Sequence, residues 1–198
     1  LGYRPPYAWE MILSFLATRA IPGVERVTPD AYRRTVSLQR GESVFRGWIG
    51  VSHVPNKNAL AVTISSALLP VLSKVVGRVK ILFDMNSSPL EVYEKLRVMN
   101  ELIPDVCVLG IRVPGCFDPF EMSVRAVLGQ QITVKAAGTL AMRFSTTFGE
   151  AIATPHAALT HTFPTPEKIR NLKAPIENHL GPIGITGARA RSILALSE

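Results

Sequence analysis

The apolar residues of this chain follow two different periods. Between positions 33 and 64, β-branched and aromatic residues gather in three short runs (33–38, 44–51 and 60–64), and Arg40-Gly41-Glu42 supplies a turn between the first two. From Asp118 onward the apolar residues recur every three or four positions, which is the period of a helix. The two patterns predict an α+β fold, with an antiparallel sheet first and an all-helical part after it.

Two helices are expected to back the sheet. Residues 9–20 carry apolar residues at helical spacing, and Ile21-Pro22-Gly23 ends that run. Residues 66–83 predict one long amphipathic helix, with Leu69 and Leu72 in its apolar stripe. Asn86-Ser87-Ser88-Pro89 breaks the pattern. We therefore predict an N-terminal α+β domain over 1–88, a connecting helix (90–102) and loop over 89–111, and a helical domain over 112–198.

The helical part begins with a strong start signal at Asp118-Pro119-Phe120-Glu121. An acceptor at the cap, a proline at the first helical position and a glutamate three residues after the cap predict a capping box. Further helices are predicted to begin near Thr133, at Thr165 and at Thr186-Gly187, the last still running at Ser197.

Charge and composition narrow the class of protein. The hydrophobic share of 47% with 19% charged residues is typical of a globular chain. No apolar stretch reaches the ~18 residues that a membrane-spanning helix needs. The net charge is +7, of which residues 1–88 contribute +6, and such a basic excess favours nucleic acid as a partner.

Cysteine and histidine patterns give no sign of a metal site. Cys107 and Cys116 lack ligand spacing and are interpreted as free, small buried residues and not as a disulfide. The four histidines have no partner at ligand spacing either. We expect no metal ion.

Two pairs of residues could serve a binding site, and the residues alone leave each open. Gln130 and Gln131 lie on a turn between helices, where paired amides can reach bases or phosphates or can cap helix ends. Phe15 and Arg19 are four positions apart and share one helix face. By pattern alone Phe15 is a core residue and Arg19 faces solvent, although an arginine beside an aromatic ring also suits the edge of a cleft.

The carboxylates do not single out a catalytic group. The capping box explains Asp118 and Glu121, and Glu91, Glu94 and Glu101 predict a solvated helix face. Arg189 and Arg191 are interpreted as solvent-facing residues of the last helix.

Several segments, taken in order, resemble a known family. They are Arg4-Pro5-Pro6-Tyr7, Phe117-Asp118-Pro119-Phe120-Glu121, the run Val127-Leu128-Gly129-Gln130-Gln131-Ile132-Thr133-Val134-Lys135-Ala136-Ala137, Phe163-Pro164-Thr165-Pro166-Glu167 and Leu180-Gly181-Pro182. This order resembles the helix-hairpin-helix DNA glycosylases of alkylation repair, of the 3-methyladenine DNA glycosylase II type. The resemblance implies an N-terminal domain like half of the TATA-binding protein, followed by the first part of a helical glycosylase domain.

The resemblance also implies an activity and its residues. The full-length protein is expected to hydrolyse the N-glycosidic bond of alkylated bases such as 3-methyladenine in duplex DNA, without metal or organic cofactor. Gln131 matches the residue that fills the gap left by the flipped base, with Gln130 beside it, and Phe15 and Arg19 match the base pocket. The hairpin and the catalytic aspartate are expected beyond Glu198, so residues 1–198 alone should be inactive.

The remaining expectations concern partners and alternatives. The resemblance implies a monomer that binds double-stranded DNA with alkylated bases in the bacterial cytoplasm, with a possible upstream methyl-sensing regulatory domain. The main alternative is a non-enzymatic DNA-binding or regulatory module with the same fold. A plain helical protein-interaction domain would explain the cores but not the order of the segments.

Overall fold

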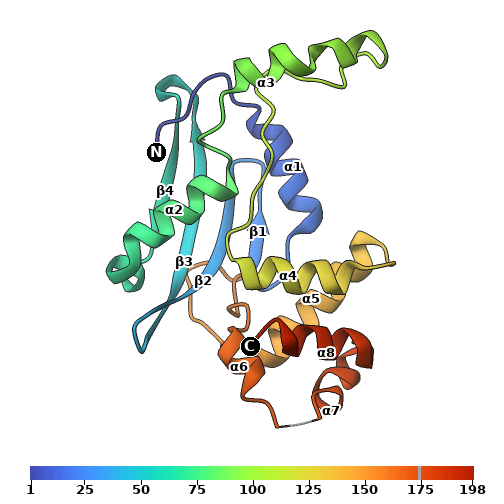
Figure 1. The fold of residues 1–198 in the computed structure, drawn as a ribbon. Coiled ribbons are helices and arrows are strands. Elements are labelled where there is room, and N and C mark those ends of the chain that lie inside the picture. The colour runs from blue at the N-terminus through green and yellow to red at the C-terminus, as the bar shows by residue number, and fades with distance from the viewer. Residues whose placement is uncertain (174) are drawn as a thin grey trace.

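A computed structural model describes residues 1–173 and 175–198, and it shows a first helix, then an antiparallel sheet, then a series of helices (Figure 1). The α+β fold class is therefore confirmed. The strands are β1 (Glu25–Val27), β2 (Ala31–Arg40), β3 (Ser43–Val54) and β4 (Ala59–Ile64). The α-helices are α1 (Trp9–Arg19), α2 (Leu72–Leu82), α3 (Pro89–Leu96), α4 (Pro119–Gly129), α5 (Val134–Phe148), α6 (Pro166–Arg170), α7 (Glu177–Leu180) and α8 (Gly187–Ala195). Short 3-10 helices are η1 (Pro55–Lys57), η2 (Ser66–Val71), η3 (Arg97–Glu101) and η4 (Gly181–Ile183).

The sheet is an antiparallel meander in the order β1-β2-β3-β4. The predicted turn is confirmed, because Arg40 pairs with Ser43 across Gly41 and Glu42. β1 is an addition to the prediction. It pairs only with residues 32–34 of β2, so the rest of β2 has no strand beside it on that side.

The first core lies between one face of the sheet and helices α1 and α2. Because side chains alternate across a strand, Tyr32, Val36 and Leu38 of β2 point to the same face and are buried there. The helices meet them with Ile12, Leu13 and Leu16 of α1 and with Val75, Val79 and Leu82 of α2. Burial of each aliphatic side chain contributes about 1.5–3 kcal/mol.

The predicted helix over 66–83 is two elements, which corrects the expectation. Residues 66–71 form η2, and α2 begins at Leu72. Leu68 and Val71 are buried three positions apart, as the three-residue turn of a 3-10 helix requires, whereas Leu69 and Leu72 are exposed. Pro70 lies inside η2 and has no N–H for an α-helical bond. The predicted apolar stripe is therefore right for Leu68 and Leu82, which are buried, and wrong for Leu69 and Leu72.

The helices from α4 onward enclose a second core. It contains Val124 and Leu128 of α4, Phe144 of α5 and Ile193 of α8, together with Ile21 and Val24 from the N-terminal part. The predicted caps at Asp118, Thr133 and Thr165 are confirmed, since each side chain accepts a hydrogen bond from the N–H three residues later. α8 ends at Ala195 and does not run through Ser197 as predicted.

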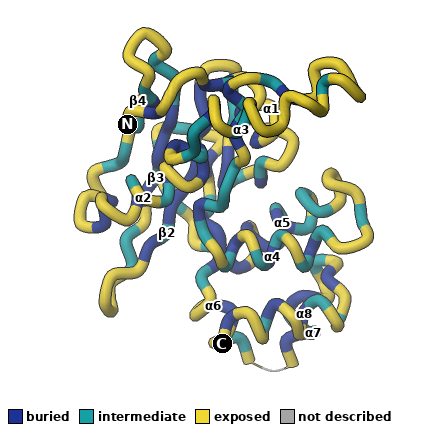
Figure 2. Tube along the Cα trace, turned by 45° about the horizontal axis from the view of Figure 1, so that its top comes forward, coloured by how far each residue is buried: buried dark blue, intermediate teal, exposed yellow. Residues whose placement is uncertain are grey.

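The segment from α3 to residue 106 projects from the body as an arm (Figure 1). The predicted helix over 90–102 is α3 followed by η3, and Glu91, Glu94 and Glu101 are solvent-exposed as expected. Figure 2 shows the arm as mostly exposed. Its exposed residues include large apolar side chains: Leu90, Leu96, Val98, Met99, Leu102 and Ile103. The predicted boundaries at 88 and 111 remain a prediction.

Other expectations concern cysteines, metals and membranes. Cys107 and Cys116 are both free; Cys107 is buried as expected, whereas Cys116 is only half-buried. Within residues 1–173 and 175–198, no group of three or more His, Cys, Asp or Glu is placed to hold a metal ion. None of the helices in that part of the chain has the length and apolar character needed to span a bilayer.

Candidate nucleic-acid interface

One aromatic side chain on α1 lies on the surface and is not packed in the core. Ile12, Leu13 and Leu16 turn the other side of α1 into the core, which leaves Phe15 40% exposed. The interpretation of Phe15 as a core residue is therefore wrong. The guanidinium of Arg19 stacks on the Phe15 ring at 3.9 Å from its centroid, as residues four apart on a helix can do.

A groove of about 460 Å³ opens beside this pair, between α1 and the helices α4 and α5. Phe15 and Arg19 line one side, and Phe117 and Met122 contribute further apolar surface. Much of the remaining lining is made of small residues: Ala126, Gly129, Ala137, Gly138 and Ala141. These residues have no side chain beyond Cβ, so they leave space open on this side of the groove.

The turn between α4 and α5 lies at the end of this groove. Ile132 of the turn lines the groove, and the preceding Gln130 and Gln131 are exposed. Gln131 has a positive φ of 56°, which only a few per cent of non-glycine residues adopt. The structure thus places both glutamines on a helix–turn–helix junction, next to the groove that Phe15 and Arg19 line.

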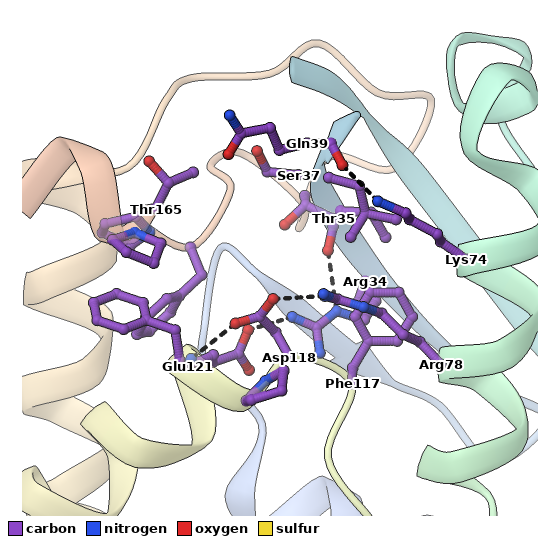
Figure 3. Close-up of a pocket in the computed structure, with 17 residues that line it drawn as sticks. Arg34, Thr35, Ser37, Gln39, Lys74, Arg78, Phe117, Asp118, Glu121 and Thr165 are labelled. Atoms are coloured by element: carbon purple, nitrogen blue, oxygen red, sulfur yellow. Dashed lines mark hydrogen bonds and ion pairs between the residues drawn. The ribbon is translucent and has the colours of Figure 1, made fainter. Parts of the chain in front are cut away.

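Sequence reasoning missed a cluster of alternating charges that forms part of the lining of the groove. It consists of Glu25 in β1, Arg34 in β2, and Glu121 and Arg125 in α4, and we refer to it as the ion cluster. An Arg34 nitrogen lies 2.5 Å from one Glu121 oxygen, and an Arg125 nitrogen lies 2.6 Å from the other. Arg125 also pairs with Glu25. Figure 3 shows Arg34 reaching Glu121 at the wall of a second cavity of about 320 Å³.

The ion cluster connects the sheet to the helical part and to α1. Arg125 donates a 2.8 Å hydrogen bond to the backbone oxygen of Arg19, the last residue of α1. Glu25 accepts hydrogen bonds from the Tyr32 hydroxyl at 2.5 Å and from the backbone N–H of Ile21 at 2.9 Å. Through these bonds, one buried group of charges positions α4 against α1 on the two sides of the groove.

The ionisation of the cluster follows from its pairing. Burial alone would raise the pKa of Glu121, but the guanidinium groups of Arg34 and Arg125 outweigh it and hold that pKa below its ordinary value. Burial opposes the charge of Arg34 as well, and Glu121 reverses this effect, so the pKa of Arg34 is raised. Glu121, Arg34 and Arg125 are thus charged at neutral pH.

The capping box is only half correct. The Asp118 carboxylate accepts a 3.0 Å hydrogen bond from the Glu121 N–H, and its other oxygen lies 2.5 Å from Arg78 (Figure 3). The Glu121 carboxylate does not reach back to the Asp118 N–H, because both of its oxygens bind Arg34 and Arg125. Those partners also make Glu121 a poor general base, since its lone pairs are occupied and its pKa is lowered.

The arginines of α8 differ from each other. Arg191 pairs with Glu177 of α7 at 2.6 Å on an exposed surface, in keeping with the predicted solvent-facing role. Arg189 instead donates a hydrogen bond to the backbone oxygen of Gln130 in the α4–α5 turn, which the sequence interpretation did not foresee.

Comparison with known proteins shows which family this arrangement belongs to. The model of the AlkA N-terminal domain matches residues 1–118. The chain belongs to the AlkA family. It is 32% identical over 198 residues to the DNA-3-methyladenine glycosylase 2 of Escherichia coli strain K12, covering 100% of this chain and 65% of that protein.

Two further relatives extend the comparison. A probable bifunctional transcriptional activator/DNA repair enzyme AlkA of Mycobacterium tuberculosis is 34% identical over 197 residues, covering 99% of this chain and 37% of that protein. The solved 3-methyladenine DNA-glycosylase from Archaeoglobus fulgidus has the same fold, with a TM-score of 0.75, 20% identity and coverage of 100% of this chain and 66% of that one. The AlkA-family chain described here therefore spans less than two thirds of the length of each of these relatives.

Proposed function

We propose that this chain is the base-recognition part of an AlkA-type DNA glycosylase. In this proposal the full-length protein hydrolyses the N-glycosidic bond of alkylated bases such as 3-methyladenine in duplex DNA. The observation that carries the proposal is the groove of about 460 Å³, bordered by an exposed Phe15–Arg19 pair and by the α4–α5 turn, in a member of the AlkA family.

The exposed ring of Phe15 suits an alkylated base. Alkylation at a ring nitrogen gives a purine a positive charge, and a cation is attracted to the face of an aromatic ring more strongly than a neutral group is. The groove supplies this face together with an apolar wall, and Arg19 lies at its edge. We therefore assign Phe15 and Arg19 to the base pocket.

The α4–α5 turn is proposed to enter the duplex. A base can be attacked only after it leaves the helix stack, which costs a few kcal/mol, and a side chain in the vacated space recovers part of that cost. Gln131 is exposed on the turn next to the groove, and Gln130 precedes it. A glutamine plug can also donate and accept hydrogen bonds with the unpaired partner base.

Gln131→Ala tests this role in the full-length protein. We expect weaker binding to a duplex with one alkylated purine and slower base release, because alanine neither fills the gap nor hydrogen-bonds the orphaned base. The measurements are a binding titration and a single-turnover time course of base release. Unchanged affinity and rate would contradict the assignment of Gln131.

The chemistry itself is assigned to groups outside this chain. Cleavage requires a carboxylate that stabilises positive charge on the sugar and helps water attack. Among the described residues, the negative charge of Glu121 is balanced by two arginines and that of Asp118 by Arg78. Neither carboxylate therefore suits that task. We expect residues 1–198 alone to release no base above background, and detectable release by this chain would overturn that expectation. No cofactor is invoked.

A regulatory DNA-binding role is the second candidate, and one observation favours it. The Mycobacterium tuberculosis relative is described as both a transcriptional activator and a repair enzyme, and residues 1–88 here carry a charge excess of +6. A saturable, sequence-dependent affinity for undamaged DNA without base release would favour this role. In either case we propose a monomer that acts on DNA in the cytoplasm, with an upstream regulatory domain as a further possibility to test.

A further inference from the structure

The backbone of the α4–α5 turn has the pattern of a type II turn. Gln130 has φ −59° and ψ 127°, and Gln131 has φ 56°. In a type II turn the second residue lies near about −60° and +120° and the third has a positive φ, whereas in a type I turn both φ angles are negative. The two forms differ by a rotation of the peptide plane between these residues. The direction of the Gln130 carbonyl therefore decides which form is present.

Gln131 is an unusual residue for its position. The third position of a type II turn requires a positive φ and is normally occupied by glycine or asparagine, because a Cβ makes this conformation costly. A glutamine there would relax to a negative φ unless the surrounding structure held the peptide in place. Something outside the turn must supply that restraint.

Arg189 is placed to supply it. Its guanidinium donates a hydrogen bond to the Gln130 carbonyl oxygen, which belongs to the peptide that distinguishes the two turn forms. The neighbouring Ala190 and Ile193 of α8 are fully buried in the second core, so the backbone that carries Arg189 is fixed. A hydrogen bond from a charged donor is about twice as strong as a neutral one. The positive charge also lies near the C-terminus of α4, where the helix dipole favours it.

We propose that Arg189 is a positioning residue that locks the Gln130–Gln131 peptide in the type II orientation and thereby aims the Gln131 side chain. The functional half of this inference rests on the proposed function, because it requires Gln131 to enter DNA. The conformational half does not, since it concerns the turn alone. The two halves are tested separately below.

Arg191 provides a matched control two residues away on the same helix. It carries the same charge, and it pairs with the Glu177 carboxylate, whereas Arg189 bonds the backbone carbonyl of Gln130 in the turn. Arg189→Met and Arg191→Met therefore remove the same charge and retain a similar apolar stem. Any difference between them reports on the contact with the Gln130 carbonyl and not on net charge.

The conformational test is an NMR measurement on the protein with isotope-labelled glutamine. A ψ near 127° at Gln130 brings its Hα close to the amide proton of Gln131, whereas the type I form brings the two amide protons together. We expect a strong Hα–HN cross-peak in the native protein and in Arg191→Met, and a strong HN–HN cross-peak in Arg189→Met. A type I pattern in the native protein, or an unchanged pattern in Arg189→Met, overturns the proposal.

A glycine at position 131 shows whether Arg189→Met acts by releasing the turn or by damaging the fold. Glycine adopts a positive φ without steric cost, so Gln131→Gly should keep the type II pattern even when combined with Arg189→Met. If the double variant loses the pattern, Arg189 supports the turn in another way and the proposal is wrong.

The functional test uses single-turnover base release by the full-length protein on a duplex with one alkylated purine. Arg189→Met should lower kcat/KM by roughly tenfold through misplacement of Gln131, and Arg191→Met should lower it by less than about twofold. In a Gln131→Ala background, Arg189→Met should add less than about twofold, because there is no side chain left to aim. If Arg189→Met has its full effect in the Gln131→Ala background as well, the proposal is wrong. If the native protein releases no base, the proposed function fails, and the NMR comparison still decides whether Arg189 locks the turn.

Discussion

Two arginine–phenylalanine stacks line the groove, and their surroundings give them different tasks. Arg34 lies 4.5 Å from the centroid of the Phe117 ring, is buried, and has both Glu121 and Glu25 within ion-pair distance. Arg19 lies 3.9 Å from the Phe15 centroid, but both residues are exposed and Arg19 has no carboxylate partner among the described residues. The same chemical pair thus holds the fold together where water is excluded and remains available to a ligand where water has access.

We expect the largest effect on stability from a substitution at Glu121. Glu121→Ala leaves Arg34 and Arg125 in the interior with only Glu25 as a counter-charge, so the free energy of unfolding should fall by about 3–5 kcal/mol. Urea unfolding followed by circular dichroism measures the change. As a control, Glu177→Ala removes an exposed partner of Arg191 and should leave the unfolding midpoint almost unchanged.

A double variant sharpens the same prediction. Arg34→Met combined with Glu121→Met removes one positive and one negative charge together and leaves the Arg125–Glu25 pair in place. Because two apolar side chains then replace two buried charges, the double variant should be more stable than Glu121→Ala. Equal losses in both variants would show that packing, and not the unpaired charge, controls the effect.

The second effect is a dependence of stability on acid. The pKa of Glu121 is lowered in the folded protein, so the folded state holds its proton more weakly than the unfolded state, where the ordinary value is 4.5. The stabilisation is therefore complete above pH 4.5 and is lost as the pH falls from there through the folded-state pKa. A tenfold difference in proton affinity between the two states corresponds to about 1.4 kcal/mol of stability. Unfolding curves between neutral pH and pH 3 should show a smaller acid loss in Glu121→Gln than in the native protein.

The smallest effect is expected at the exposed stack. Arg19→Ala should leave the unfolding midpoint unchanged, because the side chain is solvated, and should change the affinity for a duplex carrying a cationic base by about two- to fivefold. Competition binding with matched alkylated and undamaged duplexes measures this change. A loss of stability comparable to that of Glu121→Ala would remove the distinction between the two stacks.

Features that depend on neighbouring residues could be predicted from the sequence. The caps at Asp118, Thr133 and Thr165 follow from side chains that bind a backbone N–H three residues away, and the turn at Gly41 follows from its own conformational preference. The position of Gln130 and Gln131 on a turn was predictable for the same reason. Their roles, and those of Phe15 and Arg19, remain predictions.

Features that depend on distant residues could not be predicted. β1 has three residues, too few to show a period, and it exists because β2 is available for pairing. Glu121 has the spacing of a capping box, yet its partner Arg34 lies 87 positions away in the sequence, and nothing local reveals that a buried guanidinium will compete for it. Leu69 and Leu72 matched an α-helical stripe, but Pro70 and the 3-10 turn changed which leucines face inward.

The small residues that line the groove have a consequence for recognition. Alanine and glycine have no rotamers, so that part of the wall has no side-chain freedom to lose when a base is bound, and none with which to adapt to its shape. Ala126, Gly138 and Ala141 therefore form a rigid part of the lining, and the space beside them depends on how far α4 and α5 lie from α1. In the proposed function, the range of bases admitted depends on the separation of α1 from α4 and α5, and a single methyl group added to this lining would narrow the space.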